Sequence, residues 1–218
     1  MVRGTLKLAA LAASMLAPAA VLAEGQSVGL KVGALGLGVE YTYAFTERIA
    51  VRGALFGSEL GVDVEESGID YEADVVWDSI SAGVDFHPLK SALRLSAGFL
   101  KNDNRLELFS QPTGSVTIGD EPYTPAEIGT LRGDVGFDDT STYFGIGWDW
   151  SRDERIFGMS LDLGVVDQGD ASVTLRGTGL LFDDPAFLQD LDAEIADIED
   201  EVDLDVVPFL TLGFQFRF

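Results

Sequence analysis

The last thirteen residues, 206–218, read VVPFLTLGFQFRF, and their final nine positions alternate strictly between two kinds of side chain. Residues 210, 212, 214, 216 and 218 are Leu or Phe, whereas Thr, Gly, Gln and Arg stand between them. A repeat of two places successive side chains on opposite faces of an extended strand. The segment therefore predicts a strand with one bulky apolar face and one face of small or polar groups.

The same alternation recurs upstream in residues 35–45, 144–150 and 157–165. Segments of about ten residues suit the ~9–11 residues of a tilted strand that crosses a membrane. A soluble β-sandwich also alternates, but its inner face excludes water, and here the second face carries Gly, Ser and charged groups. Aromatic residues also gather at the strand ends beside the turns, as in a membrane-interface girdle. These residues are Tyr43, Phe45, Phe86, Trp148, Trp150, Phe216 and Phe218. The pattern predicts an all-β, antiparallel transmembrane β-barrel.

The terminal Phe214, Phe216 and Phe218 resemble the C-terminal assembly signal of bacterial outer-membrane β-barrels, and the size and turn spacing resemble the small OmpA- and OmpW-like barrels. Three blocks, 33–40, 112–115 with 123–131, and 184–187, are similar to an uncharacterised group of proteobacterial outer-membrane proteins. The resemblance implies a location in the outer membrane of a Gram-negative bacterium. Its partners would be outer-membrane lipid, lipopolysaccharide and the barrel assembly machinery. The resemblance carries no activity or catalytic residue.

Composition narrows the function. The chain has 14 Lys plus Arg against 37 Asp plus Glu, a formal charge of −23, which leaves no basic stripe for nucleic acid. It has no cysteine and one histidine, so disulfides, thiolate metal sites and most Ser–His schemes are excluded or hard to assemble. His87 lies in an expected periplasmic turn, away from the outer leaflet where a lipid-modifying enzyme would work. We expect no enzyme, no cofactor and no metal site.

Residues 1–23 are interpreted as a cleaved signal peptide, because Arg3 and Lys7 precede an apolar run and Ala23 suits a cleavage site. A membrane-anchor helix is the alternative, but the run is shorter than the ~20 residues that a bilayer requires. Residues 24–218 then form a single barrel domain.

Eight strands are predicted, with both termini periplasmic. Short polar turns at 46–48, 87–90 and 151–154 are assigned to the periplasm, and longer connections at 65–69, 110–137 and 167–205 to the outside. The strands are expected at 27–33, 35–45, 49–64, 70–86, 91–109, 138–150, 156–166 and 206–218. Only Ala34 separates the first two, so a single bulged strand is an alternative, with residues 171–178 supplying the missing strand. Residues 71–80 break the alternation, which predicts a kink or an exit from the membrane.

Extending the alternation places eight charged residues inside the barrel, near its periplasmic end. They are Lys31, Glu40, Arg52, Asp85, Arg94, Asp149, Asp162 and Arg217. Because an eight-stranded barrel is only wide enough for its own side chains, these charges must pair or keep water. A salt-bridged plug is the favoured interpretation, and a proton or ion relay is the alternative.

Residues 183–205 hold eleven acids and no base. Asp184 and Pro185 favour a helix start, and Leu188, Leu191, Ile195, Ile198 and Val202 recur on one helical face. We expect an acidic amphipathic helix before the last strand, serving as a lid, a cation-holding surface or a solvated face. In the link 110–137, residues 116–123 predict a small hairpin, and Thr124 with Glu127 predicts a capping box.

Three function classes remain. The favoured one is a structural or surface barrel of the envelope without catalytic activity. The second is a narrow OmpW-like conduit for small or hydrophobic solutes, which differs in having an open lumen. The third is a soluble periplasmic β-rich binding protein, which would not need detergent.

Overall fold

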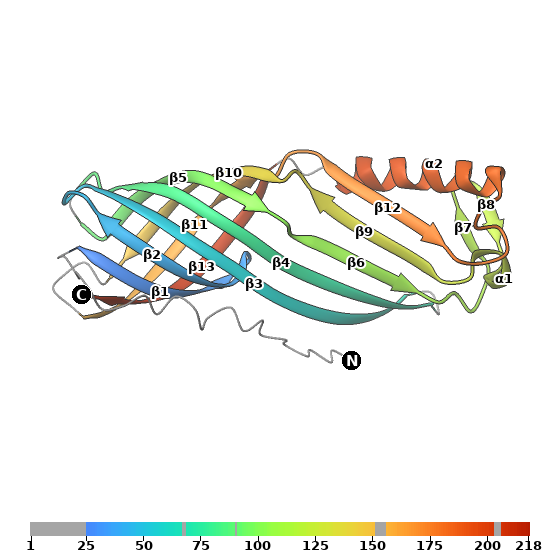
Figure 1. The fold of residues 1–218 in the computed structure, drawn as a ribbon, viewed down its shortest axis with the longest axis horizontal. Coiled ribbons are helices and arrows are strands. Elements are labelled where there is room, and N and C mark those ends of the chain that lie inside the picture. Colours follow the sequence, from blue (N-terminus) through green and yellow to red (C-terminus); the bar gives the residue numbers. More distant parts are fainter. Residues whose placement is uncertain (1–24, 67–68, 90, 151–155, 203–205) are drawn as a thin grey trace.

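The structure, a computed structural model, describes residues 25–66, 69–89, 91–150, 156–202 and 206–218 (Figure 1). The predicted signal peptide, residues 1–23, lies outside the described residues, and so does the whole turn expected at 151–154.

Thirteen strands and two helices make up the described chain. The strands are β1 (Gln26–Gly33), β2 (Gly36–Ala44), β3 (Ile49–Glu66), β4 (Ile69–Phe86), β5 (Leu93–Asn102), β6 (Arg105–Ser110), β7 (Val116–Ile118), β8 (Glu121–Tyr123), β9 (Leu131–Phe137), β10 (Thr140–Asp149), β11 (Phe157–Asp167), β12 (Ala171–Gly177) and β13 (Val206–Arg217). The helices are α1 (Pro125–Ile128) and α2 (Pro185–Val202).

Eight of the strands close into a barrel in which every neighbouring pair is antiparallel. Its order is β1-β2-β3-β4-β5-β10-β11-β13, and β13 pairs with β1 to complete the ring. The Phe218 N–H donates a hydrogen bond to the Gln26 carbonyl, so the start of the first strand and the end of the last strand of the barrel meet. They meet at the end of the barrel that carries the short turn at 46–48, which we call the short-turn end. The predicted eight-stranded barrel is confirmed.

At five consecutive places in the wall the sheet continues past the rim of the barrel, whereas β1, β2 and β13 stop there (Figure 1). Of the five wall strands, β3 and β4 run on unbroken, and β5, β10 and β11 give way to β6, β9 and β12. β3 and β4 pair along all 18 residues of each, and the outer part of β4 takes β6 as its neighbour in place of β5. β6, β9 and β12 complete this open sheet, which we call the blade. Since a crossing uses ~9–11 residues, β3 and β4 extend roughly 25 Å beyond the bilayer.

The strand predicted at 91–109 is interrupted at 103–104, where the wall becomes the blade. The Asp103 N–H donates to the Asp78 carbonyl, and Asn104 Oδ1 accepts from the Asp78 N–H at 2.8 Å. These two hydrogen bonds connect the interrupted residues 103–104 to β4, and β4 itself continues without interruption. The expected irregularity in 71–80 is thus an exchange of neighbours by an unbroken strand.

Two predicted connections contain blade strands. Residues 131–137 of the link 110–137 form β9, and residues 171–177 of the link 167–205 form β12. β12 is not a replacement barrel strand, because it pairs with β9 in the blade. Alternation over 7 residues is too short to separate these two strands from loops by sequence.

The first hairpin is real, and the single bulged strand is wrong. Gly33 pairs with Gly36, which leaves Ala34 and Leu35 as a two-residue turn. Gly36 adopts φ +89°, a left-handed conformation that favours glycine, and a Cβ there would lie 2.9 Å from the Trp77 Cβ. The Trp77 indole N–H donates to the Ala34 carbonyl at 3.0 Å and fixes the turn.

The barrel is apolar outside and polar inside. Phe99, Phe144 and Phe214 are 63%, 61% and 55% exposed, although each lies in the middle or inner half of a regular strand. Exposed aromatics collect near the short-turn end, where the Phe216 ring packs in tilted geometry against the rings of Phe157 and Phe218. A continuous apolar outer surface with an aromatic girdle is the surface that a bilayer covers.

The acidic helix covers the free edge of the blade. α2 packs along β12, and Glu199 Oε1 accepts from the Val173 N–H at 2.9 Å on that edge. Asp184 Oδ1 accepts from the Ala186 and Phe187 N–H groups, so the predicted cap is present. Edge strands otherwise expose a row of unpaired backbone groups.

A second apolar core fixes α2 to the tip of the blade. Phe187 and Leu191 bury themselves against Ile118 of β7 and Ile128 of α1. The predicted apolar face is therefore corrected at its start: Phe187 is buried, while Leu188 is 43% exposed. Phe187 lies one turn before Leu191, and its ring meets the Tyr123 ring edge-on at 5.0 Å.

The predicted hairpin and capping box in the outer link are present as β7, β8 and α1. The Tyr123 hydroxyl donates to the Asp190 carboxylate of α2, which raises the pKa of Tyr123 to about 12. The Glu127 carboxylate accepts from the Thr124 hydroxyl and N–H, and these bonds lower the pKa of Glu127. The carboxylates of Asp190 and Glu127 thus accept hydrogen bonds from Tyr123 and Thr124 of the outer link.

A charge on the outer face of the barrel should destabilise it far more than the same charge on the blade. We expect Ile146→Lys, in the middle of β10, to lower the free energy of unfolding by about 2–4 kcal/mol in lipid vesicles, measured by urea titration. Leu180→Lys, at a position 80% exposed near the tip of the blade, is the control and should change little. Equal effects of both substitutions would contradict a bilayer around β10.

Removal of the buried aromatic of α2 should release the helix. Phe187→Ala is expected to cost about 3–5 kcal/mol of local stability, because it empties the core shared with Ile118 and Ile128. Amide hydrogen exchange of α2 should accelerate in Phe187→Ala, while barrel amides keep their protection. Leu188→Ala, next to it but exposed, should leave exchange of α2 nearly unchanged.

Candidate functional site: the charged lumen

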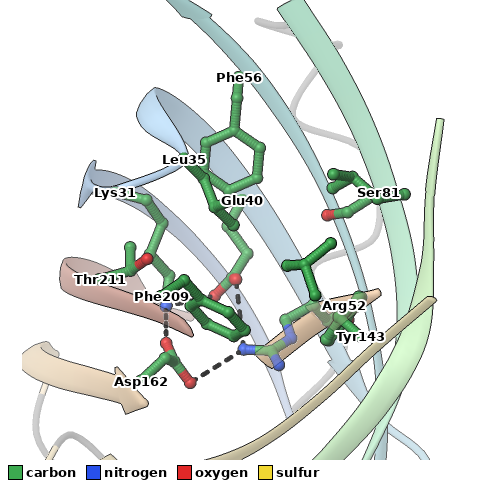
Figure 2. A pocket seen from close by; sticks show the side chains of 12 residues that line it. Lys31, Leu35, Glu40, Arg52, Phe56, Ser81, Tyr143, Asp162, Phe209 and Thr211 are labelled. Carbon is green, nitrogen blue, oxygen red and sulfur yellow. Dashed lines mark hydrogen bonds and ion pairs between the residues drawn. The ribbon is translucent and has the colours of Figure 1, made fainter. Parts of the chain in front are cut away.

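Four charged side chains form a closed ring of alternating sign inside the barrel (Figure 2). Lys31 Nζ lies 3.2 Å from Glu40 Oε1 and 2.7 Å from Asp162 Oδ2. Arg52 Nη1 lies 3.5 Å from Glu40 Oε2 and 3.4 Å from Asp162 Oδ1. The ring joins β1, β2, β3 and β11 across the lumen, so it ties together strands on opposite sides of the wall.

Four further charges extend this ring toward the short-turn end. Asp85 lies 3.1 Å from Arg52 and 4.0 Å from Arg94. Arg94 also binds Asp162 and lies 3.9 Å from Asp149, which in turn lies 3.8 Å from Arg217. The structure thus brings all eight residues of the predicted lumen network into one cluster of four cations and four anions.

Seven of the eight side chains are buried, with Arg94 at 2% and Asp85 at 1% exposure, whereas the Arg217 side chain is 28% exposed. Hydroxyl groups add hydrogen bonds to it: Lys31 Nζ donates to Ser160 Oγ at 3.0 Å, and Ser96 Oγ donates to Asp85 Oδ1 at 2.6 Å. Buried ions are tolerated when they are paired and hydrogen-bonded. The equal numbers of each sign supply the pairing, whereas Arg52 Nε, Arg94 Nε and Asp85 Oδ2 have no hydrogen-bond partner among the described residues.

Glycines on intervening strands make room for the charged side chains. In register, Gly147 of β10 lies between Arg94 of β5 and Asp162 of β11, and Gly213 of β13 lies between Lys31 and Ser160. A Cβ at Gly147 would collide with the Arg94 guanidinium, and one at Gly213 with the Ser160 hydroxyl. An ion pair can therefore reach across a strand because that strand has no side chain there.

An apolar layer closes the lumen on the blade side of the ring. Leu100, Tyr143, Val166 and Phe209 pack together, and Leu35 from the β1–β2 turn packs against them. Side chains of this layer and of the ring, among them Phe209, Arg52 and Asp162, line one cavity of about 30 Å³ (Figure 2). It is about a fifth of the ~150 Å³ of an apolar cavity that takes up benzene. The barrel therefore has no solute-sized space at this level.

Sequence reasoning found the charges and missed the parts that shape the lumen around them. Tyr143 sits opposite two glycines, Gly83 and Gly98, and a Cβ at either glycine would collide with it. The signal was present, because Tyr143 shares its parity with Gly145, Gly147 and Asp149 on the inner face of β10. Which glycine on a neighbouring strand faces Tyr143 depends on the register between the strands, and the sequence pattern does not give that register.

The predicted assembly signal lies on the outer surface of the last strand. Phe214 and Phe216 are exposed on β13, and Phe218 follows the end of that strand.

His87 follows β4 at the short-turn end, where its backbone N–H donates to the Arg48 carbonyl. Among the described residues, no three acidic or histidine side chains are grouped to hold a metal ion. No helix in the described part of the chain is both long and apolar enough to span a membrane.

Solved structures decide the fold class. The crystal structure of Acinetobacter baumannii CarO2 matches with a TM-score of 0.64 at 17% identity, covering 89% of this chain and 99% of that one. Acinetobacter baumannii CarO matches with a TM-score of 0.63 at 17% identity, covering 90% and 99%. The chain has the fold of a small outer-membrane β-barrel. No protein-family model and no curated protein sequence matches this barrel.

Removal of Arg94 should destabilise the barrel strongly. Arg94→Ala leaves Asp162, Asp85 and Asp149 with too few cations in a buried site, so we expect a loss of about 3–5 kcal/mol in the free energy of unfolding. Urea titration of the folded barrel measures it. Arg105→Ala, which removes an exposed partner of Glu107 on the blade, is the control and should cost much less. Equal stability of Arg94→Ala and wild type would count against a salt-bridged plug.

Proposed function

We propose that this protein is a non-catalytic structural barrel of the Gram-negative outer membrane, which anchors the acidic blade at the cell surface. The observation that carries the proposal is the combination of a filled lumen with a wall that continues outward. The ring of charges and the apolar layer occupy the space through which a solute would pass. Five strands, a hairpin and two helices are built beyond the rim.

The blade is constructed as a rigid surface element. Its free edge is covered by α2, and its tip has its own core around Ile128 and Phe187, which are 0% and 1% exposed. Rigid loops and extensions on a fixed scaffold are the usual place for surface function. The outer face of α2 adds a dense negative charge to this surface.

The export and assembly route belongs to the same proposal. Residues 1–23 would direct export, and Phe214, Phe216 and Phe218 would present the last strand to the barrel assembly machinery. The apolar outer wall would then contact lipid and, on the blade side, lipopolysaccharide. A soluble periplasmic binding protein is disfavoured, because such a protein would expose this apolar surface to water.

Cysteine labelling in intact cells tests the orientation, because the natural chain has no cysteine. We expect Gly114→Cys, in the exposed link before β7, to react with a membrane-impermeant maleimide from outside the cell. Arg48→Cys, in the turn between β2 and β3, should react only after the outer membrane is opened. The reverse pattern would overturn the placement of the blade at the surface.

Conductance separates the structural barrel from the narrow conduit. In planar bilayers, the folded protein should show no discrete current steps, since the lumen cavity holds about 30 Å³. Reproducible steps carried by the wild type would favour the conduit. Arg94→Ala, inserted under the same conditions, reports whether the charged cluster around the ring is the barrier.

A further inference from the structure

A second cavity, of about 180 Å³, lies where the blade leaves the barrel. On one side, β1, β2 and β13 end, and they contribute Leu35, Val207 and Phe209 to its lining. On the other side stands the inner face of the blade, with Val75, Leu106 and Phe137. The cavity exists because three wall strands stop at a level where the sheet continues at the five other places in the wall.

Most residues that line this junction cavity are apolar. Twelve of its fifteen lining residues are apolar, and the remaining three are Asn104, Arg105 and Gln168. Two of these three polar side chains are already engaged: Asn104 Oδ1 accepts from the Asp78 N–H, and Arg105 pairs with Glu107 at 2.6 Å. The cavity therefore offers no unpaired charge, and few partners for the hydrogen bonds that an ordered water needs.

The floor of the junction cavity is the apolar layer that seals the lumen. Leu35, Leu100, Val166 and Phe209 line both cavities, with the charged ring on the far side. The rim includes exposed residues such as Pro208, so a molecule enters from the outside and meets a closed floor. This arrangement retains a ligand and does not pass it on.

We propose that the junction cavity is a binding site for a small uncharged apolar molecule, of the size of one aromatic ring or a six-carbon chain. An apolar cavity of about 150 Å³ is sufficient to take up benzene, so 180 Å³ admits a molecule of this class. This site goes beyond the proposed scaffold function, because neither depends on the other. Its occupant is a free solute or the end of a lipid acyl chain, which share the same chemistry.

Trp77 provides a direct signal, because it lines the cavity and its indole is fixed on the Ala34 carbonyl. The chain has three tryptophans, and Trp148 and Trp150 lie on the exterior at 40% and 53% exposure. The variant Trp148→Phe/Trp150→Phe leaves Trp77 as the reporter inside. The variant Trp77→Phe leaves the two exterior tryptophans as the reference for partitioning into detergent or lipid.

We expect bromobenzene to quench Trp77 with saturation, whereas quenching of the exterior tryptophans rises linearly with concentration. Adding Val75→Phe and Val207→Phe to the Trp77 reporter fills the cavity from two walls and should abolish saturation. The matched control adds Val84→Phe and Val165→Phe on the lipid-facing surface and should keep it. Heat-dependent gel mobility verifies that each variant is folded.

Vesicles containing lipids with brominated acyl chains distinguish the two sources of ligand. Quenching of Trp77 by these vesicles identifies an acyl chain as an occupant, and quenching by bromobenzene alone identifies a free solute. Linear quenching of Trp77 by bromobenzene, together with no quenching by the brominated lipid, overturns the proposal. The proposal is also overturned if quenching of Trp77 still saturates in the variant that carries Val75→Phe and Val207→Phe. Phe137→Ala, which enlarges the cavity, should extend saturable quenching to 1-bromonaphthalene if the filled variant fails to fold.

Discussion

The hydrogen bonds between β1 and β13 are the constraint on which the rest of the structure depends. Inside a bilayer, each unpaired backbone group costs several kcal/mol, so a sheet is stable there only when its first and last strands meet. Seven residues of β1, from Ser27 to Gly33, pair with seven of β13 and remove both edges. Closure with eight strands then leaves a lumen that side chains alone can fill.

This narrow lumen explains why charge and glycine occur together on the inner face. The alternating ring of Lys31, Glu40, Arg52 and Asp162 needs short distances across the barrel, and Gly147 and Gly213 give the long side chains room to reach them. Because removal of one partner leaves a buried charge unpaired, the cluster penalises any slip of register between strands. The apolar layer beyond it completes the seal.

Closure also explains how the blade can exist without weakening the barrel. Five strands can leave the rim because they remain paired with one another, and only the two outer edges of the blade need cover. α2 supplies that cover on β12, through the Glu199 carboxylate and the core around Phe187. The junction cavity lies where the ends of β1, β2 and β13 face the strands of the blade, and it results from this difference in strand length.

Much of the barrel could be predicted from the chain, because alternation is a local property of a membrane strand. The eight wall strands, the inward direction of eight charges and the cap at Asp184 all follow from parity or from residues a few positions apart. The blade was harder, since β9 and β12 are each 7 residues long and lie in segments that the sequence assigned to connections. The start of the helix face was misassigned, because Leu188 and Phe187 fit a helical stripe about equally well.

The sequence by itself determined which side of each strand is apolar, since that depends only on odd and even positions. Only the tertiary structure decided which strands neighbour one another, and hence that Arg94 meets Asp162 across Gly147. It also decided where the wall stops, because the end of β1 and β2 at a two-residue turn matters only relative to the strands that continue. The pairing of strands and the level at which each strand ends depend on segments far apart in the sequence, and no local pattern encodes them.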